Sequence, residues 1–118
     1  ARLLDTRSGF PTIDGQFSGV GIRPANTVTE LTVDNRGGVP AGASTVMLNV
    51  TVTDGTQSGF LTVYPCGIAP PLASNLNYTP GTTAAVAVIA KVGVDGKVCI
   101  LNSGATQVVV DVNGYFMN

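Results

Sequence analysis

The stretch from Ala84 to Asn102, AAVAVIAKVGVDGKVCILN, contains two apolar segments that are separated by Asp95-Gly96. Asp-Gly supplies the positive φ angles of a tight turn, so the stretch predicts two strands joined as a hairpin. The first segment, residues 84–92, is apolar on both faces except for Lys91. Such a pattern is typical of a strand that is covered on both sides, and we expect it to form the centre of the domain.

The composition limits the kind of protein that these strands can build. The chain has 118 residues, of which 11% are charged, and it has a net charge of -1 and no histidine. Its length predicts a single domain over residues 1–118. The low charge predicts no nucleic-acid partner. Because no apolar run approaches the roughly 18 residues that span a bilayer, we also expect no membrane insertion.

Two cysteines, Cys66 and Cys99, lie at or near the ends of predicted strands. An even number of cysteines without metal-ligand spacing predicts a disulfide, and a disulfide indicates an extracellular compartment. The alternative is a pair of buried thiols in a cytosolic protein.

The dipeptide Asp-Gly recurs at regular intervals, at Asp14, Asp54 and Asp95. Dividing the chain at these intervals gives three units, residues 1–41, 42–81 and 82–118, each with a strand, turn, strand, loop and strand. We therefore predict a compact, antiparallel all-β domain of about 9 to 12 strands, threefold like a β-trefoil or β-prism. A β-sandwich with evenly spaced turns is the alternative. The predicted strands cover residues 2–6, 16–22, 27–34, 45–53, 59–64, 74–78, 83–92, 97–102 and 106–116.

Catalytic chemistry finds little support in the sequence. Without histidine there is no Ser-His-Asp triad, and most of the aspartates lie in predicted turns, where a carboxylate bonds to the local backbone. Asp5, Asp111 and Asn113 offer oxygen ligands for calcium, but no dense Asp-x-Asp run is present. We expect the domain not to be an enzyme, and we expect no cofactor and no metal.

Charged residues near the two ends suggest a contact between the termini. Asp5 and Arg7 share one face of a strand, and they could bind a ligand or tie the strand to its neighbours. Asp111 is embedded in valines and needs a partner, for which Arg7 or Arg2 is suitable. We therefore expect the two termini to lie side by side.

Lys91 is the single charge in its strand. One hypothesis is an intramolecular isopeptide bond to Asn49 or Asn113. The simpler interpretation is that the amine reaches water while the aliphatic stem is covered.

Amide and aromatic side chains gather in the middle of the chain. Gln57 lies in a predicted turn, Tyr64 ends a strand, and Asn75, Asn77 and Tyr78 follow a proline-rich loop. Amides bind sugar hydroxyls and aromatic rings stack on the apolar faces of sugars, so these five residues form a candidate ligand-binding site. The alternative is that the asparagines cap turns and the tyrosines fill the rim of the domain.

Several short motifs resemble those of a known family. They are Arg2-Leu-Leu-Asp-Thr-Arg7, Pro65-Cys66-Gly67, Asn75-Leu-Asn-Tyr78, Lys91-Val92-Gly93, Gly96-Lys-Val-Cys99 and Asp111-Val-Asn-Gly-Tyr-Phe116. The chain resembles, over nearly its whole length, an extracellular accessory domain of secreted and cell-surface proteins of high-GC Gram-positive bacteria, often beside hydrolase or adhesin-like domains. The resemblance implies secretion and a β fold. It supplies no activity, because the family has no established catalytic site.

The sequence therefore predicts an extracellular, non-catalytic binding module with no cofactor. The expected partner is a carbohydrate or a cell-wall or cell-surface polymer. The alternative is a structural module that associates with copies of itself or with neighbouring domains into a surface layer, stalk or filament, because low charge and open strand edges favour association.

Overall fold

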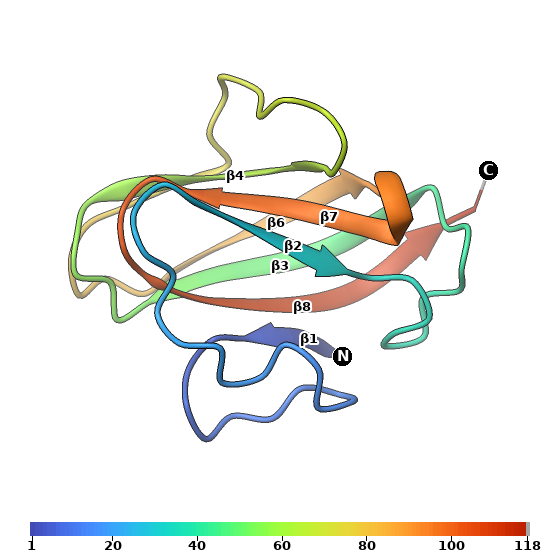
Figure 1. Cartoon of the computed structure of the whole chain (residues 1–118), viewed down its shortest axis with the longest axis horizontal. Helices are drawn as coiled ribbons and strands as arrows, with labels where there is room; N and C mark the ends of the chain where they lie inside the picture. Colours follow the sequence, from blue (N-terminus) through green and yellow to red (C-terminus); the bar gives the residue numbers. More distant parts are fainter. Residues whose placement is uncertain (118) are drawn as a thin grey trace.

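The computed structural model describes residues 1–117 and contains eight strands in two four-stranded antiparallel sheets (Figure 1). The first sheet has the order β1-β8-β3-β6, and the second has the order β2-β7-β4-β5. The strands are β1 (Arg2–Asp5), β2 (Thr27–Thr32), β3 (Thr45–Thr53), β4 (Gly59–Pro65), β5 (Leu76–Tyr78), β6 (Ala84–Lys91), β7 (Lys97–Asn102) and β8 (Gln107–Phe116). The predicted all-β class is confirmed.

The core lies between the two sheets and follows from the alternation of side chains along each strand. In β3 the residues Val46, Leu48, Val50 and Val52 are all buried, while the residues between them face outward. Equivalent buried residues of β7 and β8 belong to the same apolar cluster. Two antiparallel sheets that share one core form a β-sandwich, which is the predicted alternative. The threefold arrangement is not confirmed.

Each of the three Asp-Gly dipeptides lies between a strand of the first sheet and a strand of the second, and Asp14 lies in the loop between β1 and β2. Asp54 and Asp95 lie where the chain leaves a strand of the first sheet for a strand of the second. Residues 16–22, predicted as a strand, form a loop in which Phe17, Gly19 and Gly21 all have positive φ. Extended strands need negative φ, so this segment forms no continuous strand and contacts β1 through a single bridge between Ser18 and Asp5. The eight strands found in residues 1–117 are consequently fewer than predicted.

The prediction of a hairpin at Asp95-Gly96 is wrong, although the predicted positive φ angles of this turn are confirmed. Asp95 and Gly96 have φ of 59° and 69°, but β6 and β7 belong to different sheets. The prediction that β6 is central is also wrong, because β6 is an edge strand whose outward residues are exposed. Alanine causes this error, since its small side chain suits a buried and an exposed face equally well.

Lys91 is exposed at the end of β6, opposite Thr45. Asn49 pairs with Ala87, four residues away, which is about 13 Å along the strand. Asn113 lies on β8, which β3 separates from β6 by two strand spacings, or about 10 Å. Neither asparagine can therefore form an isopeptide bond with Lys91 in this fold, and its amine reaches water.

The predicted disulfide between Cys66 and Cys99 is confirmed, with the two Cα atoms 5.0 Å apart. It joins the end of β4 to β7 across 33 residues. Closing a loop of this length stabilises the fold by about 3 to 4 kcal/mol in the chain-entropy account. The disulfide also fixes the start of the loop over residues 66–75, which projects beyond β4 in Figure 1.

Arg36 connects the two sheets although its side chain is almost completely buried, with the residue 3% exposed. Its guanidinium donates hydrogen bonds to the carbonyl of Leu3 in β1 at 2.7 Å and to that of Thr32 in β2 at 2.8 Å. It also donates to both carboxylate oxygens of Asp14, at 2.8 and 2.9 Å, and to the carbonyl of Gln16 at 3.2 Å. One side chain thus holds β1, β2 and the loop between them together.

This loop covers the free edge of β1. The amide of Ile13 donates to the carbonyl of Arg2 at 2.8 Å, and the amide of Gly19 donates to the carbonyl of Asp5 at 2.8 Å. The amide of Asp5 donates to the carbonyl of Phe17 at 3.1 Å. Figure 1 shows the loop, in blue, alongside β1. The outer edge of β1 is therefore closed to another strand.

We predict that Arg36→Met lowers the free energy of unfolding by about 3 to 5 kcal/mol, because it leaves the Leu3 and Thr32 carbonyls without their donor and removes the partner of Asp14. Urea denaturation measures the change. Arg23→Met is the matched control, because the Nε atom of Arg23 is buried without a hydrogen-bond partner in the described chain. Equal losses in the two variants would contradict the role of Arg36.

Candidate functional site

The candidate site lies on the outer face of the second sheet, the surface that points away from the core. In register, Glu30, Cys99 and Tyr64 form one row across β2, β7 and β4. Phe60 and Asn77 form a second row across β4 and β5. Side chains of directly paired residues lie on the same face, so the sheet places these groups in a fixed arrangement.

The two tyrosines of the predicted site, Tyr64 and Tyr78, lie on opposite faces of the second sheet. Tyr78 points into the core, where its hydroxyl donates to the carbonyl of Gly104 at 2.7 Å and accepts from the amide of Gly104 at 3.3 Å. Tyr64 lies on the outer face, but it is only 5% exposed because it packs with the disulfide and Leu101. Burial, with the negative charge of Glu30 as a second cause, raises the pKa of Tyr64. Neither ring is open to a ligand.

Phe60 supplies the exposed aromatic ring that the sequence analysis did not identify. It is 40% exposed and lies opposite Asn77. The alternation along β4 could have predicted its exposure. Leu61 and Val63 face the core, so Phe60 lies on the opposite face, together with Thr62 and Tyr64. The site therefore contains one open ring, located at the end of the strand.

The three predicted amides are exposed, and hydrogen bonds fix the orientation of each one. The Asn75 Oδ1 accepts from the amide of Val63 at 2.7 Å, and the Gln57 Oε1 accepts from the amide of Ala105 at 3.0 Å. The Asn77 Oδ1 accepts from the Ser74 hydroxyl at 3.2 Å. In the described chain these oxygens are engaged while the NH₂ groups donate to no protein atom, which leaves the amide donors facing water.

The surface around these groups is open. No cleft or cavity occurs within residues 1–117, so a ligand has to lie along the sheet and the adjoining loops. Val28 on β2 shares this face of the sheet, and Ile68 and Leu72 in the loop after Cys66 are further exposed apolar residues. Such a surface suits an extended ligand better than a small molecule, which binds in concave pockets.

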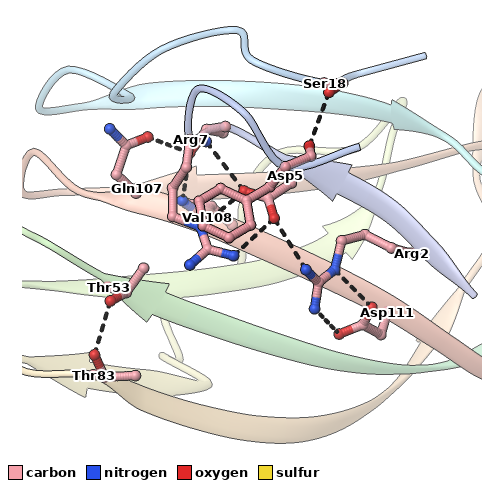
Figure 2. A network of polar contacts seen from close by, with 11 residues as sticks. Arg2, Asp5, Arg7, Ser18, Thr53, Thr83, Gln107, Val108 and Asp111 are labelled. Carbon is pink, nitrogen blue, oxygen red and sulfur yellow. Dashed lines mark hydrogen bonds and ion pairs between the residues drawn. The ribbon is translucent and has the colours of Figure 1, made fainter. Parts of the chain in front are cut away.

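A second candidate, the charged cluster on the first sheet, is fully occupied by its own members (Figure 2). The buried carboxylate of Asp5 accepts from Arg7 at 2.9 and 3.0 Å and from Arg2 at 3.1 Å. Arg2 also forms the predicted ion pair with Asp111, at 3.0 Å. The first and last strands are therefore adjacent, with the first residue of the chain beside Val112, and the cluster joins these strands rather than holding a ligand.

Metal ligands are not gathered in this cluster. The carboxylates of Asp5 and Asp111 are both bonded to arginine side chains. Among residues 1–117, no group of three or more histidine, cysteine or acidic side chains could hold a metal ion.

The charged cluster makes stability depend on pH. Burial alone would raise the pKa of Asp5, but the hydrogen bonds and positive charge of Arg7, with the charge of Arg2, lower it below its usual range. A lowered native pKa stabilises the fold above the unfolded value of about 3.9, and this contribution is lost as the pH falls below it.

We predict that the free energy of unfolding changes little between pH 7 and about pH 5 and decreases below about pH 4, the ordinary range of an aspartate. Asp5→Asn should be less stable than the wild type at pH 7, because Arg2 and Arg7 lose a charged partner, and the difference should shrink toward pH 2. Denaturant titrations across this range measure both curves. Parallel curves for the two proteins would contradict the prediction.

Comparison with known proteins adds no further assignment. The chain matches no family model, no curated protein and no solved structure. Within residues 1–117 there is also no helix long and apolar enough to cross a membrane. What the protein does has to be inferred from the surfaces of the sandwich.

Proposed function

We propose that the chain is a non-catalytic, extracellular module that binds carbohydrate, in the form of a cell-wall or cell-surface polymer, on the outer face of the second sheet. The observation that carries the proposal is an exposed aromatic ring, Phe60, opposite Asn77, with the oriented amide of Asn75 directly before β5. Sugars combine an apolar ring face with a rim of hydroxyls. A ring for stacking together with amides for hydrogen bonding complements both parts.

The orientation of the amides supports recognition of hydroxyl groups. A protein hydrogen bond to the amide oxygen holds the side chain in one orientation, and here that orientation turns the NH₂ group toward solvent. Sugar hydroxyls and ring oxygens accept such bonds. Because Asn75 and Gln57 are held by backbone amides, little conformational entropy is lost when a ligand binds.

The open surface supports a polymer as the ligand. A flat face without a cleft gains affinity from contacts repeated along an extended chain. The disulfide between Cys66 and Cys99 supports an oxidising, extracellular location.

The alternative, a structural module that assembles into a layer, stalk or filament, has to use another edge than the C-terminal strand. β8 pairs with β1 on one side and with β3 on the other, so most of its length is closed. The open edge of β6 is the observation that favours association.

Binding to an array of glycans that includes bacterial cell-wall polymers, followed by calorimetry on the hits, tests the proposal. We expect saturable binding that weakens about fivefold or more in Phe60→Ala, since stacking on an aromatic ring contributes about 1 kcal/mol or more. Phe116→Ala is the matched control, because Phe116 is exposed on the first sheet and should bind normally.

The double variant Asn75→Asp with Asn77→Asp tests the amides. It keeps both acceptor oxygens, and with them the bonds from Val63 and Ser74, but removes both NH₂ donors. We expect binding to be lost without a change in thermal stability. Asn113→Asp, an exposed change on the first sheet, is the control for added negative charge. Full binding by the double variant, or no hit on the array, would contradict the proposed function.

A further inference from the structure

The outward edge of β6 carries backbone groups without partners. The amide of Val92 donates to the carbonyl of Ser44 at 2.9 Å, so the even-numbered residues of this segment direct their backbone groups toward β3. The odd-numbered residues Ala85, Ala87 and Ile89 therefore direct theirs to the opposite side. Within residues 1–117 these groups form no hydrogen bond on that side.

The two edges of the first sheet thus differ. Within residues 1–117, a loop covers the edge of β1, but no segment pairs with the outward edge of the eight-residue strand β6. Proteins usually protect such edges with charges, prolines, bulges or a covering segment. β6 has no proline, pairs with β3 without a register shift, and carries one charge, Lys91, at its end. An edge of this kind is a template for another strand.

We propose that a second copy of this chain pairs with β6, antiparallel and about a twofold axis at Ala87, so that the two first sheets join into one sheet. In this register the two Ala87 residues are opposite each other, and Ala85 is opposite Ile89 of the second copy. The odd-numbered residues, whose backbone groups are free, then form the hydrogen-bonded pairs. The arrangement is an isologous dimer, the commonest symmetry of soluble assemblies.

Charge and size favour a second copy as the occupant of this edge. Lys91 of one chain falls opposite Thr83 of the other, so no like charges meet. Ile89, which is 72% exposed, falls opposite the small Ala85. On the inner face, Val86 falls opposite Val88, which continues the apolar layer of the core.

The other open edges are less suited to self-pairing. β2 has six residues and carries Glu30 on its outer face, and β5 has three residues. With a net charge of -1, two copies repel each other little, and β6 offers the longest of these edges, with its one charge at the end of the strand.

Cysteine substitution tests the register. Both natural cysteines form the disulfide, so an introduced cysteine is the only free thiol. In the proposed dimer the Cα atoms of the two residues at position 87 lie about 5.5 Å apart, within reach of a disulfide. At position 85 they lie about 13 Å apart. We expect Ala87→Cys to give a covalent dimer of doubled mass under mild oxidation and Ala85→Cys to stay monomeric. Equal cross-linking of the two variants, or none in either, would overturn the proposal.

A charge exchange tests the same interface without a covalent bond. Light scattering of the wild type should show a dimer that dissociates on dilution, whereas Ala87→Lys and Ala87→Asp alone should be monomers at the same concentration. Mixing these two variants should restore the dimer, because the opposite charges then face each other. Val28→Lys, an exposed change on β2, is the control and should dimerise normally. A wild type that stays monomeric up to millimolar concentration, or variants that dimerise like the wild type, would overturn the proposal.

Discussion

The guanidinium of Arg36 is the interaction on which the arrangement of this domain depends. It reaches Leu3 in the first sheet, Thr32 in the second and Asp14 in the loop between them, and it is almost completely buried. A buried charge is tolerated only when it is paired and its donors are satisfied. Because the partners come from both sheets, meeting this requirement fixes the position of β1 and β2 relative to each other and holds the loop against the edge of β1.

The two edges of the first sheet differ in whether the chain covers them. The loop that Arg36 holds supplies the hydrogen bonds that β1 lacks, whereas nothing in residues 1–117 does so for β6. The two outer faces differ as well. The first sheet joins the chain ends through Arg2, Asp5 and Asp111, and the second presents Phe60 beside oriented amides. The proposed sugar site and the proposed dimer edge thus belong to different sheets, so that a ligand on one sheet is compatible with a partner on the other.

Rigidity is what makes the second sheet suitable for binding. The disulfide joins β4 to β7, and the ring of Tyr64 fills the space beside it. The amides on this surface are already oriented, Asn75 and Gln57 by backbone amides and Asn77 by the Ser74 hydroxyl. The same packing removes Tyr64 from direct contact, so that a residue expected to bind instead supports the surface that we propose for binding.

Local patterns in the sequence predicted most of the strands, because side-chain alternation acts on neighbouring residues. The number of cysteines predicted the disulfide, and the need to pair a carboxylate embedded in valines predicted an arginine partner for Asp111. The exposed amides Asn75 and Asn77 could be found in the same way. Only the tertiary structure decided which sheet each strand joins, since that choice depends on contacts between residues far apart in sequence. It turned the Asp-Gly connections into crossings between sheets, placed the alanine-rich β6 at an edge, and sent Tyr78 into the core while leaving Phe60 in water. Backbone geometry at a turn is a local property, but the direction in which the next strand leaves it follows from where apolar surface can be buried.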